Sequence, residues 1–513
     1  MKIKALLAVL CIALSSITLH AQEYCAPPRK EIRHRITTDG SHTEMSNDLQ
    51  RASGEYIMNK FPTTGEIKGV VLLVAYADVK FGLPDDSIRS LLQNRYDAYQ
   101  YTEEIEYRGY SVVDQDSMAI RASIPGSARD YFREQSMGKF TPRFDVIGPV
   151  TLDKKRASYG GNDKNGKDKD AGSMIKEACQ KAFDLALTDF TDYDNDKDGI
   201  VDVVYVVYAG SDEAQTGIEE CIWAKASSID LKLKNGMKIS RYACSGELFS
   251  DLEGLQAGIG TFVHEFSHIL GLPDFYNTVN TDSEKLSMDV WSVMDYGLYN
   301  RGGFVPCAYT AFERYALGWL PMHTIEEPAT LNLGTTAEEK VGYRIIVAND
   351  TSSFYLVETI RKEGWNKYAY AEGLLISQVT YDAMAWKNNK VNAIDDTYRH
   401  YTVPANNCWS IEEGYNPTAH LFGTKKREFT IVSKPASITQ FGVKMNKPLT
   451  NISYNKETGK TSFDFCKINI MEGVEGIRNQ KPEIRNLYDL QGRPVENPSR
   501  GIYIQNGKKY LAF

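Results

Sequence analysis

The sequence predicts an α/β domain built on a twisted mixed sheet, followed by a β-sandwich domain. In the first half, apolar runs that indicate buried strands alternate with amphipathic stretches that indicate helices. From about Glu326, short alternating strands separated by turn residues are typical of a sandwich. The chain has 513 residues, enough for two or three domains that each bury a core.

Each element of the first domain follows from a local pattern. Ile67 to Tyr76 is a near-continuous apolar run, which predicts a strand buried on both faces. Further strands are expected at 140–152, with a break at Gly148-Pro149, and at 201–208, while 221–248 mixes strand and loop. Helices are expected at 127–135, 171–187, 259–270 and 308–317, and after Pro84 through Arg95.

The helix at 259–270 carries the strongest chemical signal in the chain. Its apolar residues recur at spacings of three and four and form one face. His264 and His268 are four residues apart on the opposite face, so both imidazoles can bind one metal ion. Glu265 lies about 100° round the helix, which suits a general base better than a ligand.

The residues after this helix predict a third ligand. Gly271 permits a left-handed turn that ends the helix, and Pro273 prevents the helix from resuming. The chain then doubles back, so that Asp274 can reach the metal. Three protein ligands leave one zinc position open, as in catalytic rather than structural sites. Glu313, on the later helix, is the alternative third ligand, and the spacing of Gly271 favours Asp274.

A second motif follows twenty residues later. Trp291 to Gly297 contains Met294, which is placed as in the Met-turn that lies beneath the zinc of metzincins without binding it. The chain resembles the immune inhibitor A family of secreted metallopeptidases. The residues that carry the resemblance are His264 to Tyr276, Trp291 to Gly297, Tyr131 to Phe140 and Asp194 to Tyr205.

The resemblance implies a metzincin-like catalytic domain and a zinc endopeptidase acting on proteins or peptides. His264, His268 and Asp274 would bind zinc, and Glu265 would be the catalytic base. Many metzincins have His as third ligand, whereas this family has Asp. Tyr296 is a candidate for stabilising the oxyanion, although a tyrosine there can also simply pack. The alternatives are a zinc amidase or esterase acting on non-peptide substrates, and a non-catalytic surface-binding protein.

A second metal site is expected at an acidic stretch before the zinc helix. Asp194, Asp196 and Asp198 alternate and are followed by Gly199, which gives the sharp oxygen-lined loop that calcium prefers. Ile200 and Asp202 take the seventh and ninth ligand positions. The twelfth position is Tyr205 instead of Glu, so this is not a complete EF-hand. The alternative is a solvated acidic turn.

The N-terminus predicts export. Residues 1–21 have a basic start, an apolar run and a final Ala21, which is typical of a secretory signal peptide. Residues 22–65 resemble a pro-segment. Cys25 within it either caps the zinc in a latent form or is an incidental thiol, and the second is favoured. The other six cysteines are an even number that permits disulfides.

We divide the remainder into a catalytic domain at 66–322, a β-sandwich at 323–470 and a C-terminal segment at 471–513. The sandwich strands are expected at 343–347, 354–359, 373–379, 428–432 and 461–465, and Trp365, Trp386 and Trp409 are interpreted as core residues in preference to sugar-stacking platforms. Residues 484–495 and 501–509 predict strands, with Asn506-Gly507 as a hairpin turn.

This C-terminal segment is similar to type IX secretion sorting signals, which would imply export across an outer membrane and attachment to the cell surface; the alternative is a plain hairpin. The formal net charge of −8 argues against nucleic acid as a partner. No run after the signal is long enough for a transmembrane helix. We therefore expect a secreted or surface-attached monomer.

Overall fold

The computed structural model describes residues 61–82, 125–164, 167–250, 255–280, 283–348, 350–394, 397–411 and 414–467. It also describes 488–490, 492–495 and short strands at 24–25, 104–107, 120–123, 474–476, 501–505 and 508–512. The signal peptide, most of the expected pro-segment and the helix expected after Pro84 lie outside these residues. Within them, no helix is both long enough and apolar enough to cross a membrane.

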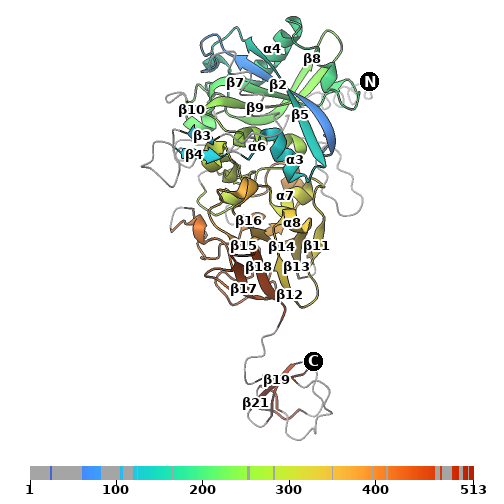
Figure 1. The fold of residues 1–513 in the computed structure, drawn as a ribbon, viewed down its shortest axis with the longest axis vertical. Helices are drawn as coiled ribbons and strands as arrows, with labels where there is room; N and C mark the ends of the chain where they lie inside the picture. The colour runs from blue at the N-terminus through green and yellow to red at the C-terminus, as the bar shows by residue number, and fades with distance from the viewer. Residues whose placement is uncertain are drawn as a thin grey trace, which may run out of the picture.

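The first domain is built on a mixed sheet with the strand order β1-β8-β9-β7-β2-β5 (Figure 1). Strands β2, β5, β7 and β9 are parallel, β8 is antiparallel to β9, and β1 is antiparallel to β8 at the edge. The strands are β1 (Tyr24–Cys25), β2 (Gly65–Ala75), β5 (Phe140–Thr151), β7 (Val204–Ser211), β8 (Lys225–Lys232) and β9 (Lys238–Ser250), with β6 (Ile200–Val201) and β10 (Leu255–Gln256) paired to β9. The expected mixed sheet is confirmed.

Helices cover both faces of this sheet. Alternate residues of β2 point to opposite faces, so Val71 and Leu73 join a core with α3 (Ala128–Gln135) and α6 (Gly260–Leu270). Val70 and Leu72 join a second core with α4 (Ala171–Asp184). This explains why β2 is a continuous apolar run in the sequence: both of its faces are buried.

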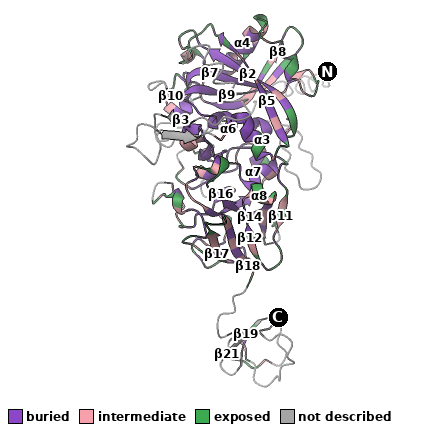
Figure 2. Ribbon diagram, in the orientation of Figure 1, coloured by how far each residue is buried: buried purple, intermediate pink, exposed green. Residues whose placement is uncertain are grey.

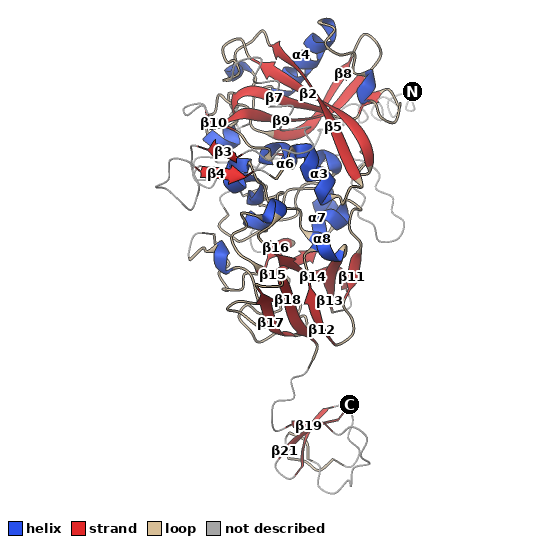
Figure 3. Ribbon diagram, viewed as in Figure 1, coloured by secondary structure: helices blue, strands red, loops and turns tan. Residues whose placement is uncertain are grey.

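The second half of the described chain is dominated by two sheets that share a core (Figure 3). A five-stranded sheet has the order β11-β13-β14-β15-β16, and a three-stranded sheet has the order β12-β18-β17. Their strands are β11 (Met322–Thr324), β12 (Ala329–Leu333), β13 (Gly342–Val347), β14 (Asp350–Ile360), β15 (Gly373–Thr380), β16 (His400–Thr402), β17 (Leu449–Asn455) and β18 (Lys460–Phe465). The shorter helices are α5 (Glu213–Thr216), α7 (Ala311–Ala316), α8 (Thr336–Glu339) and α9 (Ala383–Lys387).

Three expected elements differ from the structure. The break expected at Gly148-Pro149 is wrong, because β5 continues through it. Its pairing with β2 shifts between Leu72 and Val74, where β5 contains one residue more than β2. The strand expected at 201–208 is divided into β6 and β7. The strand expected at 428–432 makes only isolated bridges, because Thr430 and Ser433 close a turn that leaves Val432 exposed.

The two halves of the chain are joined by a common core. The cluster beneath α6 also contains side chains from β14, β15 and the loops around them, including Phe354, Leu356, Trp365, Trp386 and Val391. Trp365 and Trp386 are therefore core residues, as expected. Figure 2 shows the buried residues continuing from α6 down into the second half.

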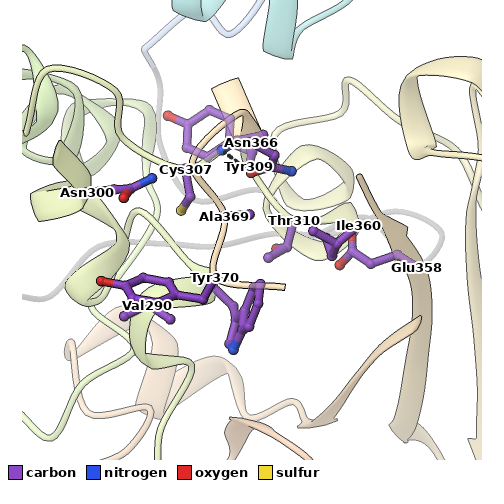
Figure 4. A pocket seen from close by; sticks show the side chains of 12 residues that line it. Val290, Asn300, Cys307, Tyr309, Thr310, Glu358, Ile360, Asn366, Ala369 and Tyr370 are labelled. Carbon is purple, nitrogen blue, oxygen red and sulfur yellow. Dashed lines mark hydrogen bonds between the residues drawn. The ribbon is translucent and has the colours of Figure 1, made fainter. Parts of the chain in front are cut away.

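A small cavity of about 10 Å³, roughly the space for one water, also lies at this junction (Figure 4). Tyr309 and Thr310 line it from the first half, and Glu358 and Asn366 from the second. The amide oxygen of Asn366 accepts a hydrogen bond from the Ala308 backbone N–H at 3.0 Å.

The C-terminal hairpin is present. Strand β20 (Gly501–Gln505) pairs antiparallel with β21 (Lys508–Ala512), and Gln505 lies opposite Lys508. Strand β19 (Val474–Gly476) runs parallel to β21. Of the range 484–495, where a strand is expected, the structure describes 488–490 and 492–495, in which Tyr488 forms bridges to Pro494 and Ile504.

The shared core leads to a prediction about truncation. A chain that ends at Met322 loses at least ten buried side chains from the cluster beneath α6, and each large core truncation costs about 2–5 kcal/mol. Domain stabilities are about 5–15 kcal/mol, so we expect this chain not to fold. A chain that ends at Lys467 should melt within a few degrees of the full-length protein. Calorimetry of both truncations measures this, and cooperative unfolding of the shorter chain would contradict it.

Candidate active site

Helix α6 brings the histidines of the sequence motif together inside the protein. All eleven of its residues are buried, which explains why its sequence is apolar around the His-Glu-Phe-Ser-His core. The helix ends at Gly271, whose φ of 107° lies in the left-handed region that favours glycine. The next residues double back beneath the helix, as the sequence predicts.

Three donor atoms form a nearly equilateral triangle at this point. Nε2 of His264 lies 3.2 Å from Nε2 of His268. Oδ1 of Asp274 lies 3.2 Å from the first of these atoms and 3.3 Å from the second. All three side chains are fully buried or nearly so. Four ligands at about 2.0–2.1 Å round a tetrahedral zinc ion are spaced about 3.3 Å apart. The triangle therefore has the size that zinc requires.

Each imidazole is oriented by a hydrogen bond on its other nitrogen. Nδ1 of His264 lies 2.8 Å from the carbonyl oxygen of Val293, and Nδ1 of His268 lies 2.7 Å from that of Leu272. A carbonyl oxygen only accepts, so each Nδ1 carries the proton and each Nε2 presents its lone pair to the metal position.

The charges of the triangle suit a cation. Burial lowers the pKa of His268, so its imidazole stays neutral at neutral pH. Burial alone would raise the pKa of Asp274, but the neighbouring His268 and His264 outweigh it and hold that pKa at about 2. Its Oδ1 accepts no hydrogen bond. A buried carboxylate oxygen that faces two nitrogen lone pairs is stabilised by a positive ion between them.

Glu265 lies beside the triangle rather than within it. One of its carboxylate oxygens is within 4.8 Å of a ring nitrogen of both His264 and His268. The side chain is fully buried. This position allows it to exchange a proton with a water between itself and the metal position.

The segment where the sequence predicts a Met-turn is hydrogen-bonded to the residue after Asp274. Met294 is fully buried, and its carbonyl oxygen accepts the N–H of Phe275, the residue after Asp274. Its own N–H donates to Oγ of Ser292, which in turn donates to Oε1 of Glu313 at 2.6 Å. The other oxygen of Glu313 accepts the N–H of Thr310 and caps α7. Glu313, the alternative third ligand, therefore supports the Met-turn and lies outside the triangle.

Tyr296 follows directly after this turn and is 6% exposed. Its backbone N–H donates to Oδ1 of Asp295 at 2.9 Å. No motif in the sequence indicated Asn389. Its amide bonds Asp274 from the second half of the chain, 115 residues away.

The acidic loop also assembles part of the expected cluster. Asp194, Asp196 and Asp198 each place one carboxylate oxygen within 4.8 Å of the others. Asp202 turns instead toward Asn195, whose backbone N–H and side-chain amide both donate to its Oδ2 at 2.7 Å.

Residues 60–321 match the family model described as the catalytic domain of immune inhibitor A peptidase M6. The chain belongs to the immune inhibitor A peptidase M6 family. It is 27% identical to Immune inhibitor A of Bacillus thuringiensis subsp. alesti over 259 residues, which cover 45% of this chain and 36% of that protein. It is 24% identical to the Pre-pro-metalloprotease PrtV of Vibrio cholerae over 274 residues, which cover 49% of this chain and 29% of that protein.

The chain thus spans about a third of the length of these relatives. Its M6 domain contains the His-Glu-His group of a zinc metallopeptidase. Asn389 lies beyond the part that the family model covers.

The triangle predicts how metal content responds to substitution. We expect the purified protein to hold about one zinc per chain at this site, and His264→Ala or His268→Ala to reduce that content to near zero because each removes one of three ligands. Elemental analysis after dialysis measures it. His323→Ala, which removes an exposed histidine of β11, is the matched control and should retain the metal. Full zinc content in the His264 variant would place the metal elsewhere.

Proposed function

We propose that the protein is a secreted zinc-dependent endopeptidase that hydrolyses internal peptide bonds of proteins. The observation that carries the proposal is the buried triangle of His264, His268 and Asp274, with Glu265 beside it, inside an M6 catalytic domain. A zinc ion held there would polarise the substrate carbonyl and lower the pKa of a water from 15.7 to about 7.

The residues around the triangle then have separate tasks. Glu265 takes a proton from the attacking water and passes it to the leaving amine. Its burial keeps bulk water from competing for that proton. Tyr296, immediately after the Met-turn, is assigned to stabilising the negative charge on the carbonyl oxygen. Asp274 would hold the ion as a carboxylate, since His268 and His264 lower its pKa despite burial.

The role of Glu265 is tested by Glu265→Gln. The substitution preserves size but removes the base, so casein degradation should fall by roughly 10²–10⁴-fold while zinc content is unchanged. Release of labelled casein fragments measures activity, and elemental analysis measures the metal. Activity within tenfold of the wild type would contradict the assignment of Glu265 as the general base. Turnover of small esters or amides without casein would instead indicate an amidase or esterase.

We also infer a structural calcium site at the acidic loop. Asp194, Asp196 and Asp198 would contribute carboxylate oxygens and Ile200 its carbonyl, with Asp202 in the ninth position. Support comes from the convergence of the three carboxylates. Because Asp202 accepts two hydrogen bonds from Asn195, it would contribute to calcium binding indirectly, through a water or by holding the loop in shape. The loop leads into β6 and β7, so a bound ion would fix the start of those strands.

The calcium site predicts a stability change. At 100 times the dissociation constant, calcium should stabilise the wild type by about 2.7 kcal/mol, and it should not stabilise Asp194→Asn/Asp196→Asn. Thermal melting with calcium and with a chelator measures this difference. Asp184→Asn, which removes an exposed carboxylate from the end of α4, should respond as the wild type does. An equal calcium response in all three proteins would rule out the site.

We further propose residues 22–65 as a pro-segment and 66–322, 323–470 and 471–513 as the catalytic, β-sandwich and C-terminal sorting parts of the chain. Strand β1 supports the first assignment. It pairs with the outer edge of β8, where Cys25 lies opposite Lys225. Lys225 in turn lies opposite Cys244. Helix α6 contacts both β1 and β8, so this edge of the sheet lies beside the helix that carries His264 and His268.

Secretion and surface attachment are proposed from the signal at 1–21 and from the C-terminal segment. The paired strands β20 and β21 support a folded hairpin in this segment. The partners proposed are therefore protein substrates and the type IX export machinery, and the protein is proposed to act as a monomer.

A further inference from the structure

The third ligand of the triangle is held by a residue of the second half of the chain. Oδ1 of Asn389 accepts the backbone N–H of Asp274 at 2.7 Å. Nδ2 of Asn389 donates to Oδ2 of Asp274 at 2.6 Å. The two hydrogen bonds close a ring between one amide and one aspartate, and both residues are buried.

This ring determines which oxygen of Asp274 faces the histidines. Oδ2 is engaged by Asn389, so Oδ1 is left directed at the two Nε2 atoms, at 3.2 and 3.3 Å. Rotation of the carboxylate would break the bond to Nδ2, and a shift of the backbone would break the bond to Oδ1. A neutral amide is suited to this position because it accepts and donates at once without adding charge.

The neighbours of Asn389 hold the same turn at several further points. The carbonyl oxygen of Asn389 accepts Oγ1–H of Thr278 at 2.7 Å. Nδ2 of Asn392 donates to the carbonyl oxygen of Phe275 at 2.6 Å. The ring N–H of Trp386 donates to the carbonyl oxygen of Gly271 at 3.3 Å. Residues 386–392 thus form hydrogen bonds with both ends of the turn that carries Asp274.

Asn389 itself has the backbone conformation that this contact requires. Its φ of 51° is left-handed, a region in which Asn, Asp and Gly are tolerated best. The short helix α9 ends just before it, and the N–H of Asn389 bonds the carbonyl of Trp386 at 3.2 Å. The side chain is therefore presented to Asp274 by a fixed turn and not by a freely rotating loop.

We propose that Asn389 is a positioning residue for the third metal ligand, so that the second half of the chain completes the zinc site of the M6 domain. The inference rests on the proposed zinc site but not on the proteolytic activity. Outer contacts to metal ligands are worth roughly 10–100-fold in metal affinity. Asn389 should contribute in this range, because it fixes both the backbone and the carboxylate of Asp274.

Two substitutions that tolerate a left-handed backbone test the proposal. Asn389→Gly removes the amide without strain at φ 51°. Asn389→Asp keeps an acceptor for the N–H of Asp274 but places a second carboxylate against its Oδ2. Zinc affinity is measured by competition with a chromogenic chelator, and the visible spectrum of the cobalt(II)-substituted protein reports the ligand geometry. We expect affinity to fall roughly 10–100-fold in the first variant, at least as far in the second, and the cobalt bands to change in both.

The chain provides a matched control. Asn451, in the same half of the chain, also has a left-handed φ, of 53°, and its Nδ2 also donates to an aspartate, Asp464, at 2.7 Å. This residue is exposed and belongs to β17. Asn451→Gly therefore removes the same kind of contact from the same kind of backbone. Its zinc affinity and cobalt spectrum should equal those of the wild type.

The variant Asp274→Ala tests whether Asn389 affects zinc binding through Asp274 or through the protein as a whole. If Asn389 acts through Asp274, adding Asn389→Gly to that variant should lower zinc affinity no further. Unchanged affinity in both Asn389 variants, or an equal loss in Asn451→Gly, would overturn the proposal. Loss of folding in both Asn389 variants, measured by circular dichroism, would also overturn it, because the residue would then act on stability alone. A protein that binds zinc in this way but does not cleave casein would leave the inference standing and reject the proposed function.

Discussion

Three electron-rich atoms that face one another inside the protein are the constraint on which the rest of the structure depends. Two imidazole nitrogens and a carboxylate oxygen lie 3.2–3.3 Å apart. Without a cation this arrangement is unfavourable, since buried acceptors repel one another and have lost their water. The surrounding fold supplies the hydrogen bonds that keep these atoms in place.

Those hydrogen bonds come from three separate parts of the chain. Val293, next to the Met-turn, orients His264, and Leu272, just past the helix end, orients His268. Asn389, from the second half, orients Asp274. The β-rich half also contributes Trp386 and Val391 to the core beneath the helix. Its role is therefore larger than that of an appended binding module, although it lies outside the segment that matches the family model.

The sequence was sufficient for the parts of the site that are local. His264 and His268 are a helical turn apart, and Gly271 marks the helix end, so periodicity and a turn signal were enough to predict that Asp274 lies beside the two histidines. Asn389 could not be assigned, because a single asparagine in a polar stretch has no distinguishing pattern and its contact spans 115 residues. The long apolar strands were predicted well, since burial on both faces leaves a continuous signal. Residues 428–432 have a composition that suits a strand, but a hydrogen bond from Ser433 to Thr430 closes a turn there. These residues therefore make only isolated bridges.

The sequence also left open whether the cysteines pair, and the structure bears on three that are fully buried or nearly so. Within the part of the chain that the structure describes, Cys179, Cys244 and Cys307 form no disulfide. Burial raises the pKa of Cys179, Cys244 and Cys307, which keeps these sulfurs protonated and slow to react with oxidants. The core around these three sulfurs is therefore held by packing alone, and its assembly does not wait for an enzyme that introduces or reshuffles sulfur–sulfur bonds.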